Sequence, residues 1–135
     1  METFPRKAKK AEGKLRRGAA FVVVRGDSDV LLRTRPAKGL LGGMTEVPST
    51  QWLRDFDEDA ALDEAPLKAK WRRLPGVVTH VFTHFPLELI VYVAKVPSGA
   101  KVPRGARFVS LELLSSEALP SVMRKVLVHA GIDPR

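Results

Sequence analysis

The sequence contains no cysteine, and this absence removes several kinds of chemistry at once. Without thiols the chain can form no disulfide, no thiolate nucleophile, no iron–sulfur cluster and no cysteine-ligated zinc site. A reducing, cytosolic setting is weakly favoured. Long apolar runs are missing too, because no stretch of about 18 apolar residues occurs and no apolar signal-peptide core follows the basic first residues. We therefore expect a chain that is neither exported nor membrane-spanning.

Acidic residues are scarce relative to basic ones, 15 against 23, and the formal net charge at pH 7 is +8. Such a surplus on a chain of 135 residues attracts polyanions through counterion release. Nucleic acid is therefore the leading class of partner, although a basic surface can also serve solubility alone. With 44% hydrophobic residues the chain can bury a core, and its length fits one domain.

Much of the positive charge lies at the N-terminus. Residues 1–18 hold seven lysines and arginines against Glu2 and Glu12. Because this segment has almost no apolar periodicity, it is predicted to be a flexible basic arm or the end of an interdomain linker. The folded domain is then expected to cover residues 19–135.

The remaining apolar pattern predicts an α/β (α+β) fold, a mixed sheet flanked by helices. Residues 20–24 and 30–32 form two strand-like runs around a polar turn, and residues 77–84 and 87–96 form a second pair with the turn at Pro86. The first run is wholly apolar, which is typical of a central strand covered on both faces. The chain therefore contains two predicted hairpins.

Three further elements complete the predicted fold. A shorter strand is expected near residues 107–110, and a short helix is expected in the acidic segment 55–64, ending at Pro66. A C-terminal helix begins at Pro120 and is capped by Gly131. Its apolar residues recur at helical spacing, so this stripe is predicted to lie on the sheet as core.

Known catalytic motifs are absent from the sequence. GxSxG, HExxH, GxxxxGK[ST] and GxGxxG do not occur. His80 and His84 have a spacing that would suit a zinc pair on a helix, but in a strand four residues span roughly 13 Å, which is too far for one ion. Six carboxylates in residues 55–64 could suggest a metal site, yet acids near a helix start also favour the helix dipole, and we favour that structural role.

The order of hairpin, glycine-rich loop, short acidic helix, hairpin and C-terminal helix resembles the Nudix fold. Nudix hydrolases carry the signature G-x5-E-x7-R-E-U-x-E-E-x-G-U, with U a bulky aliphatic residue, whose glutamates hold the cations that activate water. This chain departs from the signature, because Pro48 and Ser49 stand six positions beyond Gly42 and Gly43, and no Arg-Glu pair precedes a Glu-Glu pair. The resemblance implies a Nudix-like sheet whose metal-binding signature is missing.

Three segments make this resemblance more specific than the Nudix fold alone. RTRPAKGLLGGMTEVPSTQW (33–52), LPGVVTHVFTHFPLELIVYVAKV (74–96) and ALPSVMRKVLVHAG (118–131) together resemble the C-terminal Nudix-like domain of MutY-type A/G-specific adenine DNA glycosylases. The most specific marks are KGLLGG, H-x-F-[ST]-H and ALPSVMRKVL. One departure is Thr45, since the family usually has tryptophan before the glutamate of this loop.

The resemblance implies a function for the domain. In that family an N-terminal domain with an iron–sulfur cluster excises adenine mispaired with 8-oxoguanine, and the C-terminal domain recognises the oxidised base. We therefore expect no cofactor and no enzyme activity in this chain alone, because the catalytic domain and its cluster would lie elsewhere. The expected partners are double-stranded DNA containing 8-oxoguanine opposite adenine and the N-terminal catalytic domain of the same protein. The chain itself is expected to be a monomer in a bacterial cytoplasm.

The resemblance also assigns site residues. The family's lesion-contacting loop carries Phe-Ser-His, which Phe82, Thr83 and His84 match with threonine replacing serine. Oxidised guanine has an N–H donor at N7 beside a carbonyl at C8, so recognition needs an acceptor beside a donor. We assign the lesion edge to Thr83, apolar support to Phe82, a backbone or phosphate contact to His84, and phosphate contacts to Lys38 and to the basic residues of 68–73.

Blander roles stay open for each of these residues. Phe82 can be core, His84 can cap the hairpin, and the basic side chains can be solvated surface. Two other functions also stay open. One is an atypical Nudix hydrolase of nucleoside diphosphate-linked substrates, with Glu46 and the carboxylates of 55–64 holding magnesium. The other is a protein-docking domain with no role at nucleic acid.

Overall fold

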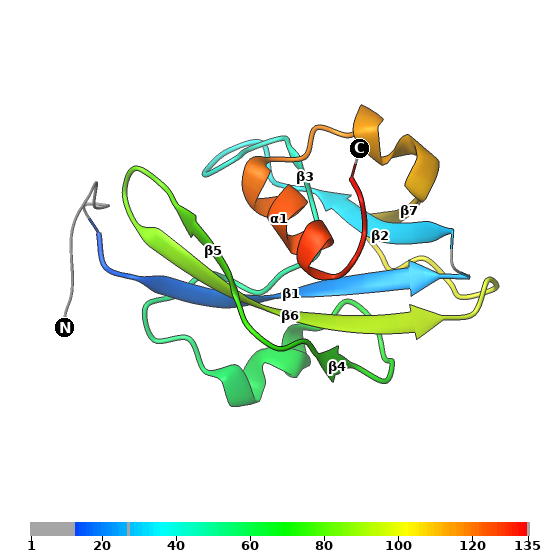
Figure 1. Cartoon of the computed structure of the whole chain (residues 1–135), viewed down its shortest axis with the longest axis horizontal. Coiled ribbons are helices and arrows are strands. Elements are labelled where there is room, and N and C mark those ends of the chain that lie inside the picture. Colours follow the sequence, from blue (N-terminus) through cyan, green and yellow to red (C-terminus); the bar gives the residue numbers. More distant parts are fainter. Residues whose placement is uncertain (1–12, 27, 135) are drawn as a thin grey trace.

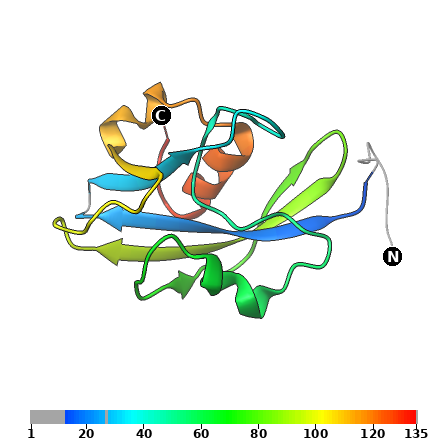
Figure 2. The ribbon, with the colours of Figure 1, turned by 180° about the vertical axis from the view of Figure 1, so that it is seen from behind.

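The structure is a computed structural model that describes residues 13–26 and 28–134. Within these residues a seven-stranded mixed sheet forms the centre, with α1 across one face and η1 on the other (Figures 1 and 2). The predicted sheet flanked by helices is confirmed. The elements in chain order are β1 (Arg16–Arg25), β2 (Asp29–Thr34), β3 (Thr45–Glu46), η1 (Glu58–Glu64), β4 (Arg72–Arg73), β5 (Val78–Val81), β6 (Pro86–Val96), β7 (Ala106–Ser110), η2 (Leu111–Ser116) and α1 (Ser121–His129), where η denotes a 3-10 helix.

The sheet has the order β3-β2-β1-β6-β4, with β7 also paired to β2 and β5 also paired to β6. β1 runs antiparallel to β2 and parallel to β6, where Arg16 pairs with Leu87 and Arg25 with Val96. Residues 18–23 are buried, as a central strand with both faces covered requires. The predictions of two hairpins and a central first strand are confirmed.

The N-terminal boundary of the fold needs a correction. β1 begins at Arg16, so residues 16–18 belong to the sheet and not to the predicted arm of residues 1–18. Their pairing with β6 uses main-chain hydrogen bonds, which need no apolar side chains, and a charge pattern therefore could not reveal it. Residues 1–12 of the predicted arm lie outside the described residues.

Two apolar clusters lie on the two faces of the sheet. The larger cluster joins β1, β2 and β6 to α1, whose Val122, Met123, Val126 and Leu127 are buried as predicted. α1 ends in a Schellman turn, because the N–H of Gly131 donates to Val128 O and that of the next residue donates to Leu127 O. Gly131 has a φ of +83°, which glycine adopts without strain.

The acidic segment forms the short helix that its composition predicts. η1 begins after Asp57, whose side chain accepts a hydrogen bond from the N–H of Asp59, and it ends at Glu64, with Ala65 as its C-cap before Pro66. Ala61 turns inward and joins Phe21 in the smaller cluster. The acidic residues therefore flank a buried alanine and leave most of their carboxylates toward water.

The second hairpin is confirmed, but its predicted turn at Pro86 is wrong. β5 ends at Val81, which pairs with Pro86, and Phe82 N–H donates to Phe85 O across 2.9 Å. Two aromatic residues that both pack inward therefore flank the turn, and proline is tolerated as the first residue of a strand. The turn itself consists of residues 83–84.

The described part of the chain holds no helix with the length and apolarity that a bilayer crossing requires. Among residues 13–26 and 28–134 the longest helix, α1, has nine residues.

Candidate nucleic-acid interface

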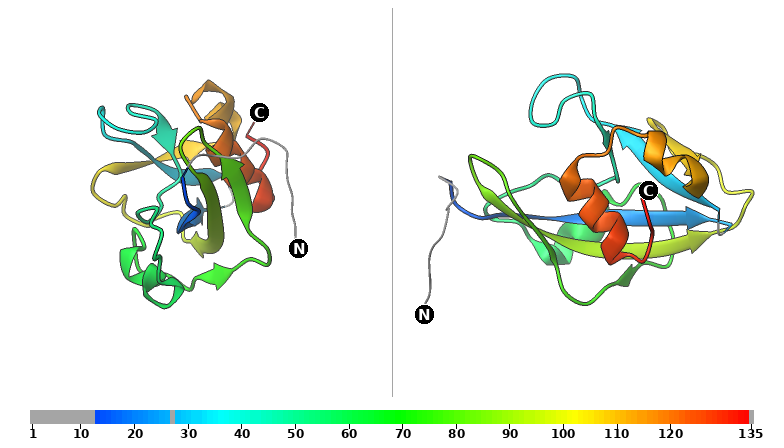
Figure 3. Two further views of the ribbon diagram at one scale, coloured as in Figure 1. Left: turned by 90° about the vertical axis from the view of Figure 1, so that its left-hand side faces the viewer. Right: turned by 45° about the horizontal axis from the view of Figure 1, so that its top comes forward.

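The turn of the β5–β6 hairpin carries two of the predicted site residues. Thr83 and His84 are exposed there, and Phe82 and Phe85 close the turn beneath them. The hairpin turn, the loop between β2 and β3 and the start of β1 lie at the same end of the molecule (Figures 1 and 3). We call residues 83–84 the hairpin tip.

A set of packed rings, of which Trp52 and Phe85 are buried, supports the hairpin tip. The ring of Phe82 stacks on that of Trp52 with centroids 5.8 Å apart and planes inclined by 23°. It also lies 5.2 Å from the ring of Phe85 and 4.7 Å, edge-on, from that of His80. Aromatic pairs at such distances stabilise one another by about 0.5–1.5 kcal/mol beyond their burial. Phe82 is thus fixed by three ring contacts directly before Thr83.

Two guanidinium groups lie against this set of rings. The Cζ atom of Arg35 is 4.8 Å from the ring centroid of Trp52, and that of Arg16 is 4.2 Å from the centroid of Phe85. Cations within about 6 Å of an aromatic face are attracted by its quadrupole. We call the series Arg35, Trp52, Phe82, Phe85 and Arg16 the aromatic column. It joins the residue directly after β2, the segment after β3, the hairpin and the start of β1.

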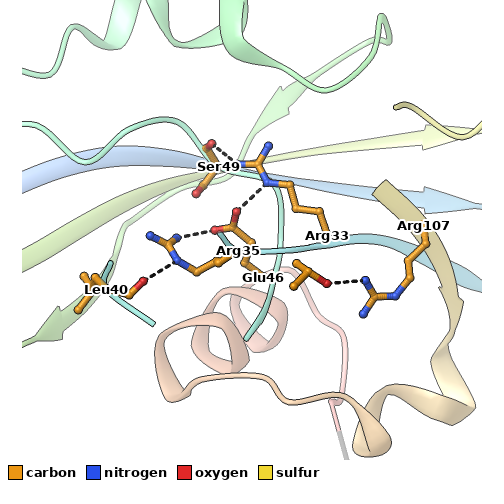
Figure 4. A network of polar contacts seen from close by, with 7 residues as sticks. Arg33, Arg35, Leu40, Glu46, Ser49 and Arg107 are labelled. Atoms are coloured by element: carbon orange, nitrogen blue, oxygen red, sulfur yellow. Dashed lines mark hydrogen bonds and ion pairs between the residues drawn. The ribbon is translucent and has the colours of Figure 1, made fainter. Parts of the chain in front are cut away.

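A buried carboxylate anchors the Arg35 end of the column. Glu46 is only 3% exposed, and its two oxygens accept from Arg33 Nε at 2.7 Å and from Arg35 Nη1 at 2.6 Å (Figure 4). Arg35 Nε also donates to Leu40 O, and Arg33 Nη2 donates to Ser49 O, each across 2.9 Å. A buried charge needs such pairing to be tolerated, so Glu46 and both arginines form one unit.

The loop between β2 and β3 carries Lys38, the fourth predicted site residue. Its shape depends on Gly42, because a Cβ at that position would lie 2.2 Å from Ala37 O. Leu41 holds a φ of +56°, a strained value for a residue with a side chain. Lys38 is exposed on this loop. The loop between β2 and β3 lies at the same end of the molecule as the turn of the β5–β6 hairpin (Figure 2).

Thr45, where the sequence resemblance led us to expect tryptophan, points into the protein. It is 5% exposed, and its hydroxyl lies 2.9 Å from Glu117 Oε1. Arg107 pairs with the same Glu117 oxygen and lies near the Thr45 hydroxyl, which links β7 to β3 and to the segment after η2. Thr45 is therefore part of a polar contact between elements and offers no face to a base.

His80 connects the base of the hairpin to α1. Lys125 Nζ donates to Thr79 O across 3.1 Å and lies 3.1 Å from His80 Nδ1, so this ring nitrogen accepts in the neutral imidazole. Burial, and next the positive charge of Lys125, lower the pKa of His80 below its ordinary value of 6.5. The neutral form of His80 therefore belongs to the folded hairpin.

The basic run 68–73 does not lie beside the hairpin tip. Arg72 pairs with Val93 in the sheet, whereas the tip lies just before Pro86. Seven residues of β6 separate these levels, which corresponds to roughly 23 Å along a strand. Arg73 is also paired with Glu58 across 2.9 Å. The tip and Lys38 thus share one end of the molecule, and residues 68–73 do not join them.

The carboxylates considered for a metal site are not gathered together. Within residues 13–26 and 28–134, no group of three or more histidines, aspartates and glutamates is arranged to hold an ion. Glu46 is enclosed by two arginines, and the acids of η1 lie on the other face of the sheet from α1. Sequence reasoning named Glu46 as a metal ligand in the hydrolase alternative. The structure gives it ion pairs instead.

Comparison with known proteins assigns the class. The family model described as the NUDIX domain matches residues 19–129, and this chain belongs to that family. A solved structure of the MutT protein from Methanosarcina mazei, 18% identical with a TM-score of 0.66 and covering 90% of this chain and 97% of its own, shares the fold.

Relatives with higher sequence identity indicate which members of the family this chain resembles. Human adenine DNA glycosylase is 32% identical over 145 residues, and the rat enzyme is 33% identical over 138. These matches cover 97% and 91% of this chain but 27% of each relative, so the chain spans about a quarter of their length. The C-terminal domain of mouse MUTYH, solved in complex with human PCNA, matches with 29% identity and a TM-score of 0.69, covering 86% of this chain and 87% of its own. The chain is thus homologous to the C-terminal domain of adenine DNA glycosylases, as the sequence motifs indicated.

Proposed function

We propose that this domain recognises 8-oxoguanine opposite adenine in duplex DNA and reads the oxidised base with its hairpin tip. The observation that carries the proposal is the exposure of Thr83 and His84 on a turn held from beneath by the partly buried ring of Phe82 and the buried rings of Trp52 and Phe85. A reading loop must present its polar groups while its backbone stays in place, and this hairpin meets both needs. The homology to the C-terminal domain of adenine DNA glycosylases supports the same conclusion.

The hairpin tip has the hydrogen-bonding groups that the oxidised base requires. The hydroxyl of Thr83 can accept a hydrogen bond from the N7–H of 8-oxoguanine. Within the described residues, the backbone N–H groups of Thr83 and His84 donate no hydrogen bond, so one of them can donate to the carbonyl oxygen at C8. Ordinary guanine has an acceptor at N7 and no oxygen at C8, and it satisfies neither contact.

Contacts to phosphate would position the duplex without reading sequence. Lys38 is exposed on the loop that shares the hairpin's end of the molecule, and His84 sits on the tip itself. The net charge of +8 supplies the general attraction to the polyanion. We assign Lys38 to a phosphate and His84 to a phosphate or backbone contact.

We further propose that this chain binds without catalysing. Base excision would belong to an N-terminal catalytic domain of the same protein, which would carry the iron–sulfur cluster that a chain without cysteine cannot ligate. The domain would then work as a monomer on DNA in a bacterial cytoplasm.

The runner-up function is a Nudix hydrolase, which the family match favours. The enclosure of Glu46 by Arg33 and Arg35 argues against it, because each carboxylate oxygen is already paired with a guanidinium group whose positive charge disfavours a cation beside it. Incubation with a panel of nucleoside triphosphates and magnesium decides the point. Turnover that Glu46→Gln abolishes would establish the hydrolase and end the binding-only proposal.

Lesion recognition is tested by fluorescence anisotropy with labelled duplexes at physiological salt. The chain is titrated into one duplex containing 8-oxoguanine opposite adenine and one containing guanine opposite adenine. We expect tighter binding to the first, a preference that Thr83→Ala reduces and that Thr79→Ala, an exposed threonine of β5 away from the tip, leaves intact. Equal binding of both duplexes by the unsubstituted chain would sink the proposal.

A further inference from the structure

The backbone around Trp52 is fixed to the central strand. The N–H and C=O of Leu53 both bond to Arg17, across 3.0 and 2.9 Å, and Thr50 N–H donates to Ala19 O across 2.9 Å. A Cβ on Gly18 would lie 2.8 Å from Cδ1 of Trp52, so the indole lies where the strand has no side chain. The backbone that carries this ring is thus fixed to β1.

The indole N–H of Trp52 is a buried hydrogen-bond donor without a partner among the described residues. Nε1 is buried and has no acceptor among the described residues. An unpaired buried donor costs about 1–3 kcal/mol relative to a bonded one. Phenylalanine would avoid this cost but would offer a smaller face. The presence of tryptophan is therefore better explained by the surface that its ring presents than by the stability it adds.

The Trp52 ring contacts two residues near the candidate interface, one on each side of the ring's place in the aromatic column. The Trp52 ring contacts Arg35, which Glu46 and Leu40 O hold in place, and it stacks on Phe82, the residue directly before the hairpin tip. A displacement of the Phe82 ring would move Thr83 with it, since one peptide unit joins them. Hydrogen-bond recognition tolerates errors of only about 0.5 Å in such a group.

We infer that Trp52 is the positioning residue of the hairpin tip. It relays the fixed geometry of β1 and of the Glu46–Arg35 pair to Phe82, and it thereby sets where Thr83 stands, without touching DNA itself. This role rests on the proposed function of the tip in lesion recognition. It predicts that Trp52 determines discrimination between oxidised and ordinary guanine and leaves general duplex affinity to the basic residues.

The chain offers a matched control, since it has two tryptophans. Trp71 packs edge-on against Phe21 with centroids 5.3 Å apart, in the smaller cluster on the face of the sheet opposite to α1. Trp52→Leu removes the stacking face, Trp52→Phe restores part of it, and Trp71→Phe changes a tryptophan away from the hairpin. Because Trp52→Leu leaves a cavity, the milder Phe82→Leu provides a second way to break the same stack.

The first readout needs no DNA. Backbone amide shifts and order parameters of Thr83 and His84 are measured by NMR in the free chain. We expect large shifts and lower order at both tip amides in Trp52→Leu and Phe82→Leu, smaller ones in Trp52→Phe, and none in Trp71→Phe. Unchanged tip amides in a folded Trp52→Leu or Phe82→Leu variant would overturn the positioning role, whatever the tip binds.

The second readout is the ratio of dissociation constants for the guanine and 8-oxoguanine duplexes. We expect this ratio to fall about tenfold in Trp52→Leu, as misplaced recognition groups imply, with partial recovery in Trp52→Phe. Binding of the guanine duplex should stay within about twofold. A ratio that Trp52→Leu leaves intact refutes the inference and spares the proposed function. A chain without any preference refutes the proposed function, while the NMR readout still decides the role of Trp52.

Discussion

Gly13 lies so close to the hairpin tip that a methyl group on it would come within 2.1 Å of the carbonyl oxygen of His84. Three residues further along the chain, the guanidinium of Arg16 contacts the ring of Phe85 at the other side of the turn. The segment that leads into β1 therefore touches the same turn that we propose to read the lesion. Anything that moves this segment is expected to move the tip.

Gly13→Ala tests this contact. The added methyl group cannot fit beside His84 O, so we expect altered amide shifts at His84 and a weaker preference for 8-oxoguanine. Residues 13–15 precede the first strand and can move aside, so the free energy of unfolding should change by only about 0.5 kcal/mol. NMR and urea unfolding give the two quantities. Gly99→Ala is the control, because a Cβ there meets nothing within 4 Å; an equal response from both variants would contradict the contact.

The Glu46 ion pairs give a prediction about stability. Glu46→Gln leaves Arg33 and Arg35 facing a neutral group in a buried position, and breaking buried pairs costs about 3–5 kcal/mol. Both arginines are partly exposed, so we expect a loss of about 2 kcal/mol in the free energy of unfolding, measured with urea. The control is Glu58→Gln, whose pair with Arg73 is exposed and should contribute about 1 kcal/mol at most. Similar losses in the two variants would show that burial of Glu46 does not matter.

The sequence predicted the sheet and its helices well because those features follow from local patterns. The apolar run of β1, the proline and glycine at the ends of α1 and the acidic start of η1 each indicate one element. The predicted end of β5 was wrong, because the alternation of side chains in the sequence continues through a tight two-residue turn and does not mark where the strand ends. The start of β1 was missed because Arg16 and Arg17 join the sheet through their main chain.

The candidate site was only partly predictable. Phe82, Thr83, His84 and Lys38 came from a family motif, and their exposure or packing could not be read from it. Trp52 and Arg35 lie within the segment 33–52 but were not singled out, because the contacts of Arg35 with Trp52 and of Trp52 with Phe82 join residues far apart in the chain. The only signal for these residues in the sequence would have been aromatic and charged residues that lie outside the predicted strands.

The lowered pKa of His80 predicts that the free energy of unfolding depends on pH. Its pKa is lowered in the folded chain, mainly by burial and next by Lys125, so the unfolded state binds more protons as the pH falls. The contribution of neutral His80 is fully present above pH 6.5 and is lost as the pH falls from 6.5 through the lowered folded pKa. His80→Gln keeps an acceptor for Lys125 and cannot titrate. Urea unfolding on both sides of this window should show a larger loss for the unsubstituted chain; parallel losses would rule out His80 as the cause.

Replacement of Lys38 is expected to change the salt dependence of DNA binding without changing the discrimination between oxidised and ordinary guanine. If Lys38 contacts one phosphate, Lys38→Gln should weaken binding to both duplexes equally and reduce the slope of log K against log salt concentration by about 0.9. Anisotropy titrations over a range of salt give this slope. Lys101→Gln, in the loop after β6 at the opposite end of the molecule, should leave it unchanged (Figure 1). A loss confined to the 8-oxoguanine duplex would mean that Lys38 reads the base.

The most direct measurement is an NMR titration of the isotope-labelled chain with the two duplexes. With 8-oxoguanine opposite adenine, we predict that the amides of Thr83 and His84 show the largest shifts, and that Thr83→Val, which keeps the shape but removes the hydroxyl, abolishes the difference between the duplexes. With guanine opposite adenine, shifts should be confined to basic surface residues such as Lys38. Identical shifts with both duplexes, or lesion-specific shifts away from residues 83–84, would contradict recognition by the hairpin tip.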